Sequence, residues 1–215
     1  MLLIDTWRFI VEHPERFLAA LERHVVLSGA ALAIGVAIAV PLGMWVARHP
    51  RRALVAVALA NTGRTLPSLA VLALVMPLLG TGFAPSLFAL VLIALPPILI
   101  NTCTGVEGVG ADVLDAAAGM GMSARERTLQ VDIPLALPVI VTGLRTAAVQ
   151  VVSAATLAAY IGGGGLGDLI TAGIALLAMP QLLAGAIPAS LLALGTDQLF
   201  GALQRALSAR GAGGP

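Results

Sequence analysis

Apolar runs long enough to cross a bilayer are the feature that most constrains how this chain folds. They recur between about residues 24 and 203 and are separated by short polar or glycine-rich segments. A helix needs about 20 mainly apolar residues to span the hydrocarbon layer. Of the 215 residues, 59% are hydrophobic and only 11% are charged, a balance foreign to soluble globular domains. We therefore expect an all-α, polytopic membrane helix bundle.

Five transmembrane helices are predicted, and the second is the least regular. A polar insert at residues 61–68 interrupts the apolar stretch, so we predict a short helix to about Ala60 and then a span. In the third span, consecutive prolines at residues 96 and 97 predict a kink. The predicted spans are residues 24–47, 67–79, 85–103, 135–160 and 181–203.

The chain divides into a transmembrane domain and two short ends. Residues 1–23 mix charged and bulky apolar side chains and are split at Pro14, which predicts amphipathic pieces lying in the membrane interface. A soluble extramembrane tail is the alternative for this segment. Residues 24–207 form the predicted transmembrane domain, and residues 208–215 a cytoplasmic tail.

Arginine placement predicts the orientation in the membrane. Residues 48–52 (RHPRR) are the densest basic cluster, and by the positive-inside rule this loop is cytoplasmic. The N-terminus is then outside, the glycine-rich loop at residues 162–167 is also outside, and the C-terminus is cytoplasmic.

A polar island at residues 115–134 interrupts the apolar pattern. Its first part is alanine-rich and helix-forming, and Gly121 breaks that helix. Ser123 with Glu126 reads as a capping box that begins a second short helix, which Pro134 is expected to end. The island therefore predicts a helix-turn-helix outside the membrane, suited to contact a soluble partner.

The island resembles the coupling-loop motif of ABC importer permeases, in which Glu-Ala-Ala, Gly and Ile-x-Leu-Pro stand at fixed spacing. Every spacing matches, with conservative replacements at three positions. The resemblance implies that residues 109–134 form the loop that docks on the cytoplasmic ATPase subunit. The alternative is an ordinary polar loop. The matching residues are Asp115, Ala116, Ala117, Gly121, Val131, Ile133 and Pro134.

Longer strings, such as NTGRTLPSLAVLALVMPLLG and ATLAAYIGGGGLGDLI, resemble permease subunits of importers for glycine betaine, carnitine and choline. The likeness covers roughly residues 20–205 and departs at Arg64, where glutamine is expected. It implies a methionine-importer-like fold in the bacterial cytoplasmic (inner) membrane. It also implies three partners: a second permease subunit, identical or homologous, an external substrate-binding protein, and an ATPase dimer that binds ATP and magnesium.

Other functions fit the sequence less well. An importer of the same architecture for an amino acid or another small solute is the nearest alternative. A stand-alone channel or secondary carrier is a second, but no internal repeat of the kind carriers show is evident. No catalytic residue, metal site or bound cofactor is expected, since the histidines lie at ends and in loops, Cys103 is the lone cysteine, and no Walker motif is present. No nucleic-acid-binding patch is evident either.

Two charges fall inside predicted spans. Arg145 and Asp197 each lie on the order of 10 Å from the cytoplasmic side, where an isolated charge is costly. We predict that they pair across the fourth and fifth spans and act as a latch on the inner gate. The alternative is that each side chain reaches the interface separately.

Overall fold

The computed structural model describes residues 1–211, without the side chains of Pro50 and of residues 209–211. Every regular element in this range is helical. In chain order the elements are α1 (Leu2–Glu12), α2 (Pro14–Ala47), α3 (Pro50–Arg64), α4 (Ser68–Leu79), α5 (Phe83–Glu107), α6 (Ala111–Gly119), α7 (Ala124–Arg127), η1 (Thr128–Asp132), α8 (Ile133–Ala155), η2 (Leu157–Ile161), α9 (Leu166–Ala175) and α10 (Met179–Gly211).

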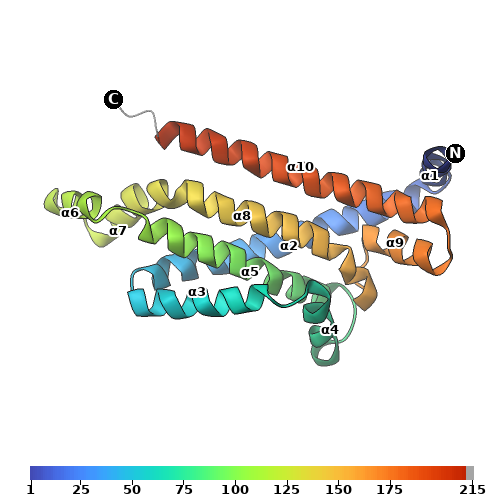
Figure 1. Cartoon of the computed structure of the whole chain (residues 1–215), viewed down its shortest axis with the longest axis horizontal. Helices are drawn as coiled ribbons and strands as arrows, with labels where there is room; N and C mark the ends of the chain where they lie inside the picture. Colours follow the sequence, from blue (N-terminus) through green and yellow to red (C-terminus); the bar gives the residue numbers. More distant parts are fainter. Residues whose placement is uncertain (212–215) are drawn as a thin grey trace.

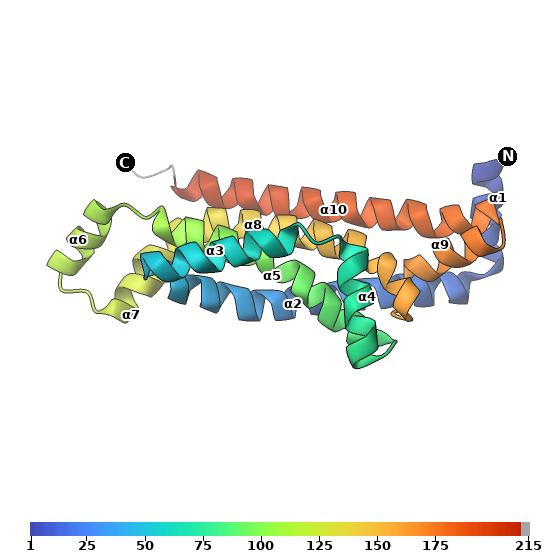
Figure 2. The ribbon, with the colours of Figure 1, turned by 60° about the horizontal axis from the view of Figure 1, so that its bottom comes forward.

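The long helices form a bundle around α5. Helix α5 packs against both α2 and α8, which also contact each other, and α8 packs against α10. These helices run along the long axis of the molecule, with α6 and α7 beyond one end and α1 at the other (Figures 1 and 2). Four helices are long and apolar enough to span a membrane, and α3 with α4 supplies a fifth span only as a pair bent by 95°. The expected polytopic helix bundle is confirmed.

Glycines at two crossings set how closely α5 meets its neighbours. A Cβ atom added to Gly43 of α2 would lie 2.7 Å from Cβ of Thr102, and one added to Gly143 of α8 would lie 2.6 Å from Cβ of Asn101. Real Cβ atoms do not approach so closely, so larger residues would push these helices apart. Close contact between backbones replaces the hydrophobic driving force that is missing between helices in lipid.

The first long helix begins at Pro14 rather than near His24 as predicted. Proline is suited to the first turn, where its missing N–H has no helical partner to lose. With 34 residues, α2 is about 50 Å long, which exceeds a hydrocarbon layer of about 30 Å. Residues 14–23 therefore belong to helix α2 and extend it beyond the hydrocarbon layer. Only α1 forms a separate N-terminal helix, and it packs against α10.

Three further boundaries differ from the prediction. The short second helix reaches Arg64 instead of Ala60, and the turn at residues 65–67 separates it from α4. Helix α5 continues through both of its prolines, and the kink expected there stays a prediction. Helix α9 was not predicted. Helix α10 continues through residues 208–211, which were expected to belong to a cytoplasmic tail. The remaining residues of that predicted tail, 212–215, lie outside the described part of the chain.

Candidate functional site

The predicted coupling segment projects from one end of the bundle as α6 and α7 (Figures 1 and 2). Within α6, Asp115 and Ala116 are exposed, whereas Ala117 is only 1% exposed. Ala117 therefore lies on the inner face of α6, and Asp115 and Ala116 lie on its solvent-exposed face. This exposed face is available to a partner protein.

Gly121 makes the turn between the two short helices. Its φ of +78° lies in the left-handed region that glycine adopts without a steric penalty. Its backbone N–H donates to the carbonyl of Ala118, and that of Met122 donates to the carbonyl of Ala117. These two bonds form a Schellman motif, which satisfies the last carbonyls of α6. The predicted helix break at Gly121 is confirmed.

The capping box predicted at the start of α7 is confirmed. The Ser123 amide donates to Oε2 of Glu126 over 2.8 Å, and the Glu126 amide donates to Oγ of Ser123 over 3.3 Å. Hydrogen bonds from the Ser123 side chain and then its backbone hold the pKa of Glu126 below the usual range. A four-residue helix has little stability of its own, so this cap is what begins α7 at a defined residue.

The second short helix does not end at Pro134, which corrects the prediction. It continues through the π-helical turn η1 directly into α8, and Pro134 occupies the first turn of α8. Proline has no N–H to donate, and the hydrogen-bond pattern widens to the π type just before it, where the Ile133 amide donates to the Thr128 carbonyl. Val131 and Ile133 are half-buried, while Pro134 is exposed. A force on α7 therefore acts on the end of a transmembrane helix and not on a flexible loop.

An ion pair that the sequence did not predict ties this segment to α2. Nη2 of Arg48 lies 3.5 Å from Oδ2 of Asp132, and the Asp132 side chain is only 7% exposed. The same nitrogen donates to the hydroxyl of Thr128. In the sequence analysis, Arg48 was used only to predict the orientation of the chain in the membrane. The signal that could have revealed the pair is Asp132, an acidic residue at the base of the polar island, because a buried acid needs a partner.

The structure brings Arg145 and Asp197 together. Nε and Nη2 of Arg145 donate to Oδ1 and Oδ2 of Asp197, each over 2.7 Å, in the two-pronged geometry that suits guanidinium and carboxylate. One turn toward the α6 end, Nε2 of Gln204 donates to the Thr142 hydroxyl over 2.8 Å. The two contacts fasten α8 to α10. Whether the pair acts as a gate latch stays a prediction.

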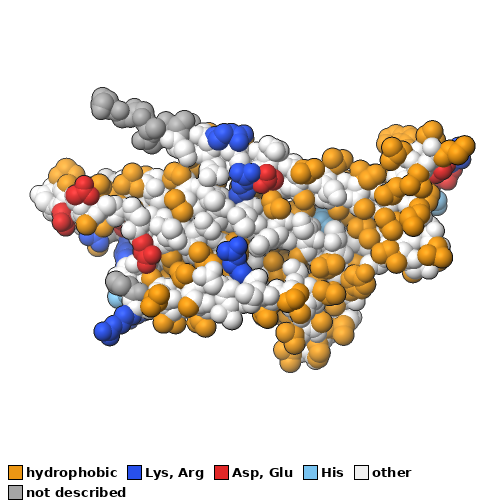
Figure 3. All heavy atoms as spheres, in the orientation of Figure 1, with side chains coloured by type: hydrophobic (Ala, Val, Ile, Leu, Met, Phe, Trp, Pro, Cys, Tyr) orange, Lys and Arg blue, Asp and Glu red, His pale blue; other side chains and the backbone are white. Residues whose placement is uncertain are grey.

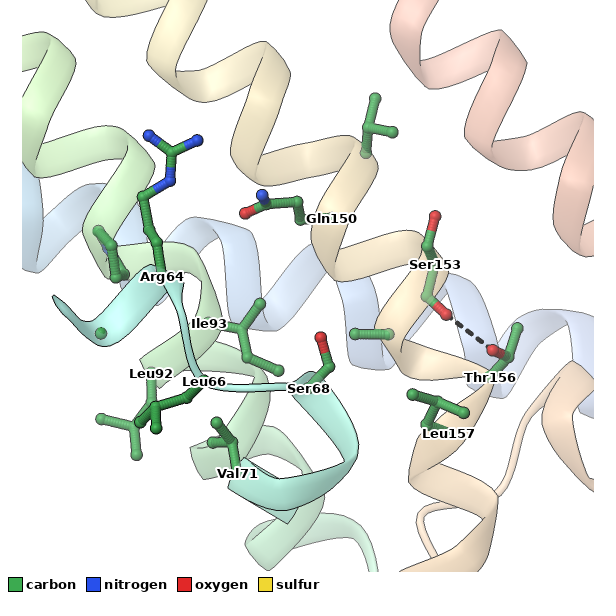
Figure 4. A pocket seen from close by; sticks show the side chains of 14 residues that line it. Arg64, Leu66, Ser68, Val71, Leu92, Ile93, Gln150, Ser153, Thr156 and Leu157 are labelled. Carbon is green, nitrogen blue, oxygen red and sulfur yellow. Dashed lines mark hydrogen bonds between the residues drawn. The ribbon is translucent and has the colours of Figure 1, made fainter. Parts of the chain in front are cut away.

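A cavity lies between α3, α4, α5 and α8, at the bend between α3 and α4. It is called the polar cavity after the five polar side chains in its otherwise apolar lining. Its volume is about 620 Å³, within the roughly 300–1,000 Å³ of small-molecule sites. Arg64 and Gln150 extend into the same space, and Ser68, Ser153 and Thr156 line it farther along (Figure 4). Polar groups inside membrane spans face a water-filled path or another helix rather than lipid.

Much of the remaining surface is apolar. Figure 3 shows hydrophobic side chains over α4 and over the end that carries α1, whereas charged groups gather on the half toward α6 and α7. The polar cavity therefore stands out from a surface that lipid can cover.

A family model described as the binding-protein-dependent transport system inner membrane component matches residues 39–210. The chain belongs to this family. The permease is 39% identical over 204 residues to the choline transport system permease protein OpuBB of Bacillus subtilis, covering 95% of this chain and 94% of that protein. It is 40% identical over 188 residues to the glycine betaine/carnitine/choline transport system permease protein OpuCB of the same organism, with 87% of each chain covered.

Solved structures agree with this assignment at the level of the fold. The inward-facing MetNI methionine ABC transporter aligns with 91% of this permease and with 98% of its own chain, at a TM-score of 0.77 and 18% identity. The expected methionine-importer-like fold is confirmed. The permease is thus an ABC importer subunit of the inner membrane, and the resemblance to osmoprotectant permeases is confirmed by its relatives.

Proposed function

We propose that this permease carries an osmoprotectant of the quaternary-amine class, such as glycine betaine, carnitine or choline. The relatives named for these solutes match nearly the full length of the chain, which supports the substrate class. The observation that carries the mechanism is the projecting pair α6 and α7 with its exposed Asp115 and Ala116. That shape suits a groove on an ATPase subunit, which binds the ATP and magnesium that this chain does not.

Motion of the ATPase dimer reaches the membrane by two routes. Helix α7 leads without interruption into α8, so a tilt of α7 is a tilt of α8. The Arg48–Asp132 ion pair passes the same motion to α2. Because α2 and α8 both pack against α5 and also against each other, moving both together rotates the bundle as one body.

The polar cavity forms one half of the translocation path. A second permease subunit, identical or homologous, covers the cavity and supplies the other half. An external substrate-binding protein delivers the solute at the α1 end, and the path opens by alternating access as the ATPases close on ATP. The α6 end is cytoplasmic in this arrangement, because residues 48–52 and the end of α10 lie with it.

The test is co-purification from the native membrane with a tag on the C-terminus. We expect an ATPase and a permease subunit to be recovered, and a binding protein loaded with glycine betaine, carnitine or choline to stimulate ATP hydrolysis and uptake into proteoliposomes. Uptake of an ordinary amino acid alone would contradict the proposed quaternary-amine substrate but would leave the assignment as an importer intact. Recovery of the chain without an ATPase would contradict the mechanism.

A further inference from the structure

Arg64 is a charged side chain inside the membrane domain without a countercharge. The ion pairs formed within the described part of the chain are Arg48–Asp132 and Arg145–Asp197, and neither involves Arg64. Helix α3 runs for 15 residues from Pro50 to Arg64, which places Arg64 about 20 Å along the helix from the basic loop. That depth lies well inside a hydrocarbon layer of about 30 Å.

The Arg64 side chain is exposed and lines the cavity instead of packing between helices. It extends into the polar cavity, where Gln150 of α8 faces the same space (Figure 4). A guanidinium held at this depth needs water or an anion as its partner. Five N–H donors in a planar fork fit a carboxylate better than any other common anion in a small organic solute.

The rest of the cavity wall suits the other end of a zwitterion. Its lining residues, all within the described range, include no acidic and no aromatic side chain. A bare organic cation would therefore find neither a countercharge nor an aromatic face, and the guanidinium would repel it. Leu92, Ile93 and Val149 offer apolar surface for N-methyl groups instead.

We infer that Arg64 is a specificity-determining residue that binds the carboxylate of a zwitterionic solute in the path. The site favours glycine betaine or carnitine over choline, which lacks a carboxylate. This inference rests on the proposed function, because it selects among the solutes that the function allows. The solute enters the cavity with its carboxylate against Arg64 and Gln150 and its methylated ammonium against the apolar wall.

The test places a thiol in the cavity of the complete importer. Ser153→Cys is introduced with Cys103→Ala, and the complex with its ATPase is reconstituted in nanodiscs without binding protein. Labelling by N-ethylmaleimide is followed as glycine betaine or choline is added. We expect glycine betaine to protect the thiol at a concentration roughly tenfold or more below the concentration of choline that gives the same protection. The difference is the expected contribution of a charge-assisted hydrogen-bond pair between Arg64 and the carboxylate.

Two variants assign the effect to the guanidinium. Arg64→Gln should remove the preference for glycine betaine, and Arg64→Lys should keep part of it, since charge remains but the planar fork is lost. The matched control is Arg51→Gln, which removes an exposed arginine from the other end of the same helix and should leave the preference unchanged.

Several results would overturn the inference. Equal protection by both solutes, no protection by either, or protection unaffected by Arg64→Gln would each do so. Loss of the second permease subunit on purification of Arg64→Gln would show that Arg64 pairs with that subunit instead. Failure of the proposed function looks different: the unmodified importer would then take up none of the three solutes from loaded binding protein.

Discussion

Arg48 and Asp132 meet at the base of the coupling segment, with Nη2 and Oδ2 3.5 Å apart. The arginine follows the last residue of α2, and the carboxylate belongs to the π turn that leads into α8. The contact therefore joins two transmembrane helices at the α6 end of the bundle, the end on which we propose that the ATPase docks. The Asp132 side chain is 7% exposed and the Arg48 side chain 39%, so the acid depends on its partner more than the base does.

Arg48→Gln should reduce uptake per ATP hydrolysed, because α2 no longer follows the coupling segment. It should also destabilise the protein by about 1–3 kcal/mol, the cost of leaving a buried charged group without its partner. Arg48→Gln with Asp132→Asn should recover much of the stability but not the coupling. Thermal unfolding and the ratio of transport to hydrolysis measure the two effects. Equal ratios in both variants and the wild type would show that the ion pair is not part of the coupling route.

Substitution of Gly121 should disturb the coupling segment through the backbone alone. Space is open around it, with no atom within 4 Å of an added Cβ, but its φ is +78°. In Gly121→Val, holding the valine in the left-handed backbone conformation should cost about 1–2 kcal/mol. The variant should therefore transport less while still inserting into the membrane. Gly119→Ala is the control, since Gly119 is also open and lies in the helix. Normal transport by Gly121→Val would mean that the turn is not needed.

The cap of α7 should weaken in acid. Because the pKa of Glu126 is lowered in the folded protein, the capping contribution is fully present above the ordinary glutamate pKa of about 4.3 and is lost as pH falls through the lowered value. Amide hydrogen exchange in α7, corrected for its intrinsic pH dependence, should show this loss. Glu126→Gln should make the protection independent of pH, and Glu126→Ala should remove it throughout. An identical acid profile in Glu126→Gln would assign the loss to another group.

Neutralising Arg145 or Asp197 alone should harm the permease more than neutralising both. Either single change leaves a charge within the membrane domain without its partner. Expression and uptake are compared for Arg145→Gln, Asp197→Asn and the double variant, with the Gln204–Thr142 contact left in place. We expect the double variant to express better than either single one. Strictly additive losses would show that the observed pair contributes no mutual stabilisation.

The orientation is testable with thiols placed at the two ends of the bundle after Cys103→Ala. Glu12→Cys, exposed near the end of α1, should react in whole cells with an impermeant thiol reagent. Arg51→Cys and Arg125→Cys should react only after the membrane is opened. Labelling of Arg125→Cys from outside would reverse the proposed topology.

Local signals account for the parts of the coupling segment that were predicted correctly. A glycine turn and a Ser-x-x-Glu cap depend on neighbours within a few residues, so Gly121 and Ser123 could be interpreted from the sequence. The role of Pro134 was predicted wrongly because proline both ends helices and occupies their first turns, and the sequence does not say which. Arg48 and Asp132 are far apart in the chain, and only the packing of α2 beside α8 brings them together.

The membrane domain shows the same division. Hydropathy located the spans, but it could not tell whether residues 14–23 lie flat or extend α2 beyond the lipid, since both allow charged side chains. Helix α9 was missed because its ten residues are too few for a span. The cavity around Arg64 combines residues of four helices, α3, α4, α5 and α8. The sequence therefore marked Arg64 as unusual but could not place Gln150 opposite it.

The bend between α3 and α4 has a consequence for how cells make this protein. It leaves Arg64, Ser68 and Ser153 around one cavity, which the second subunit of the proposed assembly would shield from acyl chains. A chain inserted alone would place these groups against lipid, where charged and polar groups without partners are costly, and the unassembled chain should be degraded faster than the assembled one. Its half-life should therefore be set by the supply of its partner, so that the two subunits accumulate in step even when their synthesis does not.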